Sequence, residues 1–289
     1  MASGFGRKYD RPVGDVRPSA VAGSWYPGTR AGLARAVDVY LASAAPGRAP
    51  ECPLAIIAPH AGLMYSGPVA AHAYALVRRC EYSAVVLVGP SHFVGFEGVS
   101  IWPRGTWTTP FGDVAVATEL AAAIAAESRD IIEHPTAHGR EHSLEMQLPF
   151  VAHLLPGVPI VPLVMGYQTR ETAYALGDAL AHAIESYVET RGEVLLVASS
   201  DLSHYEDAAT ASRMDAVVVK YVETFDVDGL MDALDREPRH ACGGGPMVSV
   251  LRAARQRGAT RTQVLQYADS GDVSGDKSSV VGYMAAAIW

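Results

Sequence analysis

The sequence is poor in cysteine and has no long apolar run. Its cysteines, Cys52, Cys80 and Cys242, are too few and too irregularly spaced for a disulfide framework or a four-cysteine zinc site, so we expect any functional cysteine to act as a single thiol or thiolate. No segment approaches the roughly 18 consecutive apolar residues of a membrane span. The first twenty residues mix charges with prolines where a signal peptide would need an apolar stretch. These absences predict a soluble, cytoplasmic protein with no membrane partner.

Lysine is also scarce, and no basic run is present. The 289 residues hold 23 Lys and Arg against 31 Asp and Glu, a formal net charge of −8, and only three of the cations are lysines. Without a basic patch, the chain lacks the electrostatic signature of a protein that binds DNA, RNA or anionic lipid, so we expect no nucleic-acid partner. Apolar residue types make up 49% of the chain and charged types 19%, which indicates a globular protein with a large buried core.

From about residue 50 onward, short apolar runs alternate with longer segments of helical periodicity, as in a βαβ chain. Strands covered on both faces are expected over 54–58, 84–88, 160–164 and 194–198, with a last strand within 279–289. Helices are expected over 69–78, 119–126, 141–155, 172–190, 212–225 and 247–257. Because no linker divides the chain, we expect residues 1–289 to form a single three-layer α/β/α domain around a mainly parallel or mixed sheet, with an N-terminal extension over residues 1–16.

Polar side chains follow three of the expected strands at the point where each strand ends. His60 follows the first run, His92 follows the second, and Asp201 and His204 follow the fourth. The carboxyl ends of parallel strands meet at one edge of a sheet, and ligands bind in the crevice outside that edge. A lone histidine more often caps a helix or satisfies a carbonyl group, but four such groups at three strand ends predict a shared site.

The side chains expected at this crevice are typical metal ligands. Imidazole suits Fe, Cu, Zn and Ni, and a thiolate shifts the preference toward Cu(I), Zn and Fe(II). Cys242 stands directly before three glycines, which allow the backbone to approach a ligand closely. We therefore predict that His60, His92 and Cys242 bind a metal, whereas Cys52 and Cys80 are expected to be small buried apolar side chains.

A second group of histidines is His134, His138 and His142. Their spacing could place them on one helical face, but Pro135 and Gly139 interrupt a helix there, so we expect a loop that leads into a helix near Glu141 and Glu145. His142 could still face the crevice. The segment 272–277 is expected to be a turn, because it lacks the residues of a phosphate or calcium loop. No nucleophile elbow or dinucleotide fingerprint follows a strand, which excludes the simplest serine-hydrolase and NAD-dependent functions.

Six motifs resemble those of the MEMO family, whose bacterial members are called AmmeMemoRadiSam system protein B. The resemblance runs in one order from about Arg17 to the end of the chain. The motifs are AGSWYP (22–27), IIAPHAG (56–62), GPSH (89–92), EHSLEMQLP (141–149), SSDLSH (199–204) and CGGGP (242–246).

The resemblance implies a fold similar to that of the class III extradiol dioxygenases, the LigB-like enzymes that open catechol rings with non-haem iron and O₂. By that pattern, His60 and His92 match the two iron-binding histidines and His204 matches the acid/base histidine. Cys242 takes the place of the expected carboxylate ligand, as in the MEMO branch. Trp25 and Tyr65 match aromatic residues of the family's pocket.

These observations lead to three hypotheses. The first is a redox protein that holds Fe(II), or else copper, and acts as a dioxygenase-like oxidoreductase on a small organic molecule, with His204 as general acid/base and Asp201 orienting it. The second is a non-enzymatic module that uses the same crevice to bind a peptide or small anion. The third is a zinc-dependent hydrolase. In each case the residues expected to bind the substrate are Trp25, Tyr65, His142 and Glu145.

Overall fold

Four buried strands form the parallel centre of the sheet. In the computed structural model, which describes residues 16–44 and 51–289, these are β2 (Ala55–Ala58), β9 (Val194–Ser199), β3 (Ala84–Pro90) and β8 (Ile160–Met165). They lie side by side in the order β2-β9-β3-β8, and every residue in them is buried. The strands expected from the four apolar runs are therefore confirmed. Each run is apolar on both faces, as a strand covered on both sides requires.

Antiparallel strands extend this centre on both sides, so the sheet is mixed. Within the described residues the complete sheet has nine strands, ordered β10-β12-β2-β9-β3-β8-β4-β7, and β11 pairs with β12. The additional strands are β10 (His204–Glu206), β11 (Thr262–Asp269), β12 (Val280–Ile288), β4 (Val99–Ile101) and β7 (Ile131–Ile132). The expected last strand is therefore confirmed as β12. A small separate sheet contains β1 (Val16–Arg17), β5 (Thr106–Thr109) and β6 (Gly112–Ala115).

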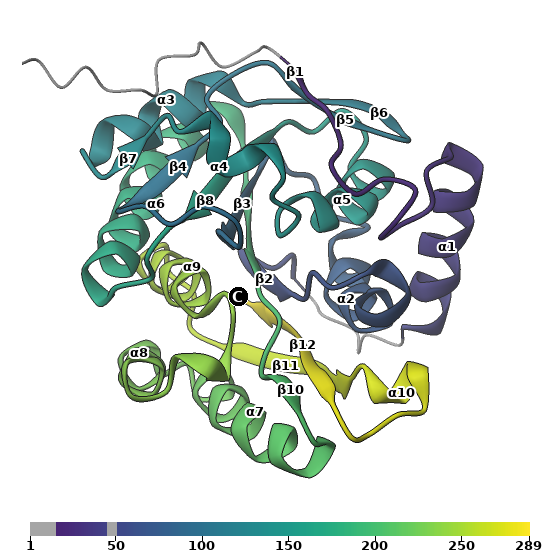
Figure 1. Ribbon diagram of the computed structural model, residues 1–289. Coiled ribbons are helices and arrows are strands. Elements are labelled where there is room, and N and C mark those ends of the chain that lie inside the picture. Colours follow the sequence, from purple (N-terminus) through teal and green to yellow (C-terminus); the bar gives the residue numbers. More distant parts are fainter. Residues whose placement is uncertain (1–15, 45–50) are drawn as a thin grey trace, which may run out of the picture.

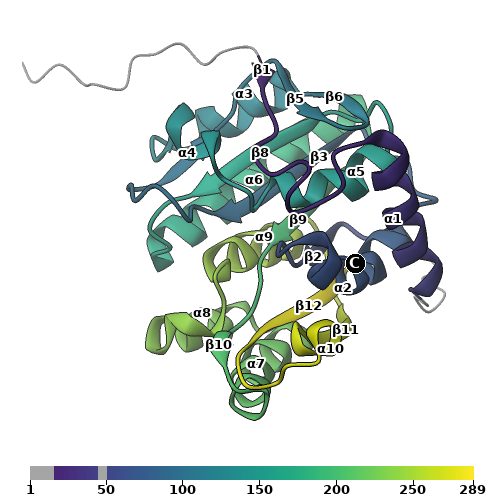
Figure 2. The same cartoon turned by 45° about the vertical axis from the view of Figure 1, so that its right-hand side comes forward.

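Helices cover both faces of the large sheet (Figures 1 and 2). Helices α6 (Arg170–Arg191) and α9 (Gly244–Gln256) pack on each other, and α9 also contacts β9, β3 and β2. On the other face, α2 (Leu63–Val77) contacts β2 and β12, and α1 (Arg30–Ser43) packs on α2 and α5 (Leu148–Leu154). The remaining long helices are α3 (Thr118–Glu127), α7 (Ala208–Glu223) and α8 (Val227–Arg236). The three-layer α/β prediction is confirmed, although sequence reasoning missed α1 and α8.

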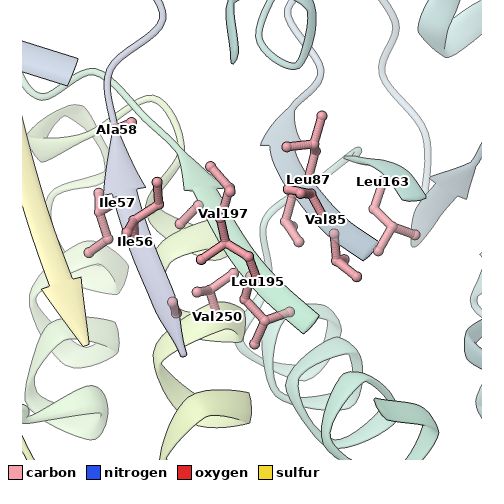
Figure 3. Packing of buried hydrophobic residues seen from close by; sticks show 14 of the residues in the cluster. Ile56, Ile57, Ala58, Val85, Leu87, Leu163, Leu195, Val197 and Val250 are labelled. Carbon is pink, nitrogen blue, oxygen red and sulfur yellow. The ribbon is translucent and has the colours of Figure 1, made fainter. Parts of the chain in front are cut away.

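The core lies between these layers. Figure 3 shows Ile56 and Val197 on neighbouring strands, with Val250 of α9 beside them. All three side chains are fully buried. None of the helices in the described part of the chain combines the length and the apolar character needed to cross a bilayer.

The segment 134–155 differs from the expectation. A short helix, α4 (Pro135–Gly139), forms where a loop was predicted; proline is compatible with a first helical turn, because its missing N–H is not needed there. The predicted helix 141–155 begins only at a 3₁₀ turn over Glu145–Gln147, which leads into α5. The Glu141 carboxylate accepts hydrogen bonds from the backbone N–H groups of the next two residues, which stabilises a turn before the helix. Similarly, a one-turn helix, α10 (Gly271–Ser274), occupies part of the predicted turn 272–277.

The prediction for two of the cysteines is wrong. Cys52 and Cys80, which are 28 positions apart in the sequence, form a disulfide with their Cα atoms 5.7 Å apart. Cys52 precedes β2 and Cys80 follows α2, and the β2–α2 unit returns the chain to the sheet edge where β2 begins. Sequence spacing alone does not show this proximity. The bridge closes a loop that contains His60.

Reduction of this disulfide should lower the free energy of unfolding by roughly 3 kcal/mol, because a loop of this length gains conformational freedom in the unfolded chain. Urea unfolding with and without a phosphine reductant measures the change. A Cys52→Ala/Cys80→Ala variant is the control, since its unfolding midpoint should not respond to the reductant. Equal midpoints for the oxidised and reduced wild-type protein would contradict the prediction.

Candidate metal centre

The structure brings His60, His92 and Cys242 together at the carboxyl edge of the parallel strands. One possible ligand atom from each residue lies within 4.8 Å of the others, and His60 Nε2 is 3.2 Å from Cys242 Sγ. His60 follows β2, His92 follows β3, and Cys242 precedes α9. Glycine at position 243 permits this approach, because a Cβ atom there would lie only 2.4 Å from the Ser199 carbonyl oxygen. We call these three residues the metal triad, and their binding of a metal stays a prediction.

Glu141, which sequence reasoning did not place among the functional residues, holds His92. Its Oε1 atom lies 2.9 Å from His92 Nδ1 and accepts from the His142 and Ser143 backbone N–H groups, while Oε2 accepts from the His92 N–H at 2.6 Å. Although burial opposes ionisation, the hydrogen bonds and charge of His92 outweigh it and lower the pKa of Glu141 to about 2. An ionised carboxylate only accepts, so His92 Nδ1 donates and Nε2 is left for a ligand.

The donor atoms of His92, Glu141 and His142 also lie within 4.8 Å of one another. However, the carboxylate of Glu141 already accepts four N–H groups, from His92 Nδ1 and from the backbone of His92, His142 and Ser143. This second cluster is therefore better described as support for the metal triad than as another metal site. The position of Glu141 directly before His142 in the EHSLE motif was the sequence signal that could have identified it.

The other two members of the metal triad are held in a poorly solvated environment. His60 is 1% exposed. Burial, followed by the charge of the nearby His92, lowers its pKa well below the ordinary value, which favours the neutral form that binds metals. Cys242 is a free cysteine whose Sγ accepts from the Asp201 N–H at 3.3 Å. Burial, reinforced by the charge of Asp201, raises the pKa of the Cys242 thiol well above its usual value. The thiol must therefore lose a proton before the sulfur binds a metal.

Asp201 does not orient His204, which corrects the sequence prediction. The Asp201 carboxylate accepts the backbone N–H of His60 at 2.7 Å, and its burial raises its pKa to about 7. His204 Nδ1 instead donates to the Leu202 carbonyl oxygen at 2.8 Å. The two side chains are separated because the backbone leads them to different parts of the sheet. Asp201 faces the end of β2, whereas His204 begins β10, which pairs with β12. Burial lowers the pKa of His204, and with Nδ1 donating, its Nε2 is left to accept a proton.

Aromatic rings border the metal triad. The His142 ring stacks on the His92 ring, with the ring centroids 4.5 Å apart. The ring centroids of Trp25 and His142 are 4.3 Å apart. Trp25 is 38% exposed, so it is available to a ligand that enters the crevice. Tyr65 is half-buried against the hydrophobic core in the first turn of α2. The structure thus places His142 and Trp25 at the crevice, and their contact with a substrate stays a prediction.

Glu145 is not available to a substrate, contrary to the sequence prediction. Its side chain is fully buried, and its carboxylate accepts from Arg17 Nη1 at 2.5 Å and from the Tyr26 hydroxyl at 2.8 Å. It also accepts the backbone N–H groups of Ala20 and Val21. These contacts secure the segment 17–26, which carries Trp25 to the crevice. The role of Glu145 is therefore to anchor this segment.

The histidines at 134 and 138 do not reach the metal triad. His138 is fully buried, and its Nε2 atom lies 2.9 Å from the Ser100 hydroxyl. Burial, assisted by Arg17, lowers the pKa of His138 to about 3. His134 is also buried, and its carbonyl accepts from Ser100. Of this histidine group, only His142 joins the crevice.

Comparison with known proteins agrees with this architecture. The Memo family model, described as Memo-like protein, matches residues 17–287. A MEMO1 family protein of Methanothermobacter thermautotrophicus is 39% identical over 275 residues, covering 93% of this chain and 98% of its own. One from Sulfurisphaera tokodaii is 36% identical over 281 residues, with coverage of 93% and 98%. The solved structure of an uncharacterized Escherichia coli K12 protein, JW3007, shares the fold, with a TM-score of 0.52, 15% identity and coverage of 81% of this chain and 99% of that chain. The chain therefore belongs to the Memo family.

Proposed function

We propose that this protein is a mononuclear metal-binding redox protein that acts on a small organic substrate. In this proposal His60 Nε2, His92 Nε2 and Cys242 Sγ hold Fe(II), with copper as the second choice and zinc as the third. The observation that carries the proposal is the convergence of three donor atoms within 4.8 Å, from residues up to 182 positions apart. The carboxyl edge of a parallel sheet is where ligands commonly bind.

The chemistry of the donors fits such an ion. Two neutral imidazoles and one thiolate form a set that suits Fe(II), Cu(I) and Zn(II), and three protein ligands leave coordination positions for a substrate. When bound, the ion would supply Lewis-acid and one-electron chemistry. The outer partners also fit, since metal-binding histidines commonly donate their second N–H to a carboxylate, as His92 does to Glu141.

The protein's own residues would bind the substrate and move its proton. His142 and Trp25 offer aromatic surfaces beside the metal triad. His204, whose Nδ1–H is fixed on the Leu202 carbonyl, presents Nε2 as a proton acceptor. Its lowered pKa keeps the ring neutral near pH 7, which suits a general base.

Metal analysis tests this proposal directly. The protein is purified anaerobically with Fe(II), or with copper under reducing conditions, and the metal content per chain is measured for the wild type and for His60→Ala and His92→Ala. We expect about one ion in the wild type and almost none in the variants, because a two-ligand remnant binds weakly. His153→Ala is the matched control, since His153 bonds to Asp38 away from the metal triad. Unchanged metal content in His60→Ala and His92→Ala would exclude the proposed site.

A non-enzymatic binding function is the second candidate, and one observation favours it. Exposed aromatic side chains border the crevice: Phe93 is 52% exposed with its ring 5.8 Å from that of His142, and Tyr205 is 78% exposed beside His204. Such exposed rings are common where a peptide or other extended ligand docks. An oxygen-electrode screen with catechols, aminophenols and thiols separates the two functions, because only the redox function consumes oxygen.

A further inference from the structure

The Ser199 hydroxyl lies behind His60 and has three hydrogen-bonding partners. Its Oγ atom is 2.9 Å from His60 Nδ1, 2.7 Å from Gln147 Nε2 and 2.6 Å from the Ser143 carbonyl oxygen. Ser143, Gln147 and Ser199 are fully buried, and His60 is 1% exposed. Because these side chains are buried, the direction of each hydrogen bond is set by the neighbouring protein groups.

The orientation of the Gln147 amide is fixed at both ends. Its Oε1 atom accepts the Tyr74 hydroxyl at 2.9 Å, and its Nε2 atom donates to the Pro59 carbonyl oxygen at 3.2 Å. A carbonyl oxygen can only accept, so the atom that faces Pro59 must be the nitrogen. That same nitrogen faces Ser199, which therefore receives an N–H from Gln147.

A proton count then determines the state of the His60 ring. The Ser199 hydroxyl has one proton, and the Ser143 carbonyl, which can only accept, receives it. The two lone pairs of Oγ remain for Gln147 Nε2–H and for His60. His60 Nδ1 must therefore donate, and in the neutral ring the lone pair is on Nε2, the atom that lies 3.2 Å from Cys242 Sγ.

We propose that Ser199, held in one donor–acceptor direction by Gln147 and Ser143, is the positioning residue that fixes the metal-binding tautomer of His60. The inference rests on the proposed metal-binding function. The two histidines of the metal triad then differ in their outer partners: His92 donates to the charged carboxylate of Glu141, whereas His60 donates to a neutral hydroxyl. Loss of an outer partner of this kind typically weakens metal binding 10- to 100-fold.

The first part of the test is made on metal-free protein. Long-range ¹H–¹⁵N spectra of histidine-labelled, chelator-treated wild type should show His60 with its proton on Nδ1. In Ser199→Ala the proton should move in a measurable fraction of molecules to Nε2, whereas Ser199→Thr, which keeps the hydroxyl, should retain the wild-type tautomer. A wild-type ring protonated on Nε2 would overturn the inference, whatever the variants show.

The second part measures Co(II) affinity by competition with a chelator. Ser199→Ala should bind about 10- to 100-fold more weakly than the wild type, and Ser199→Thr should recover most of the loss. Ser100→Ala is the matched control, because Ser100 is also fully buried and also partners a histidine, His138, at 2.9 Å, but lies outside the metal triad. Its affinity should equal that of the wild type. Wild-type affinity in Ser199→Ala, or equal losses in Ser199→Ala and Ser100→Ala, would overturn the inference. A wild-type protein that binds no metal would instead refute the proposed function, and the spectra of the metal-free protein would still decide the tautomer.

Discussion

Replacing Glu145 with glutamine should lower the free energy of unfolding by about 3–5 kcal/mol, the usual cost of removing one partner from a buried ion pair. The pair with Arg17 is almost completely buried, at 0% and 1% side-chain exposure. The substitution leaves the Arg17 guanidinium buried without a counter-charge. Urea unfolding followed by circular dichroism measures the change.

A double-mutant cycle separates the ion pair from the other contacts of Glu145. Arg17→Met should also destabilise the protein, and Arg17→Met/Glu145→Gln should cost less than the sum of the single changes, because neither charge is then left alone. Arg170→Met is the control: Arg170 pairs with Asp232 and Asp235 at the solvent-exposed surface, where ion pairs contribute little. Additive effects of the Arg17 and Glu145 changes would contradict the prediction.

The affinity of the metal triad for Co(II) should rise about tenfold per pH unit between pH 8 and 9. The sign follows from the Cys242 thiol: its pKa is raised well above the usual value by burial, so the metal-free protein carries a proton on the sulfur throughout this range. Metal binding requires the thiolate and therefore releases this proton, which a higher pH favours. This range lies a full pH unit or more above the pKa of Asp201, about 7, so Asp201 is already ionised and contributes little to the slope. Competition titrations at several pH values measure the slope.

Two variants of Cys242 serve as controls. Cys242→Glu replaces the thiol with a carboxylate, which ionises at a lower pH than the thiol in the same buried position, so its affinity should depend less steeply on pH. This variant should also keep iron while binding copper more weakly, because a carboxylate is the harder ligand. Cys242→Ala should lose more affinity than Ser199→Ala, since it removes a ligand rather than a ligand's partner. A wild-type slope as flat as that of Cys242→Glu would show that the sulfur does not bind the metal.

The sequence predicted the centre of the fold well because its physical signal is local. The strands β2, β3, β8 and β9 are continuously apolar, and such short runs between helical segments predict a doubly covered parallel sheet without knowledge of distant contacts. The Cys52–Cys80 disulfide could not be found in this way, because it depends on where two connections end in space.

The convergence of His60, His92 and Cys242 was predicted from the sequence, but the contacts that support these residues were not. Placement of His60 and His92 at one edge follows from the direction of parallel strands, which the sequence pattern reveals. The assignment of Glu145 failed because its partner, Arg17, is 128 positions away and the ion pair leaves no local pattern. The pairing of Asp201 with His204 failed for the opposite reason: nearness in sequence suggested a contact, but the chain separates the two side chains at β10.

The place of β2 in the sheet has a consequence for biosynthesis. This strand, which carries His60 at its end, lies between β9 and β12, and both neighbours are translated long after it, at Val194–Ser199 and Val280–Ile288. While the ribosome is still adding β12, β2 lacks one of its two partners, even though Cys242 has already been made. Pairings between such distant segments form slowly and late. Under the proposed metal-binding function, the ion is therefore expected to bind after β12 has been translated, when His60 has been fixed opposite Cys242. During synthesis the three ligands would not yet lie together.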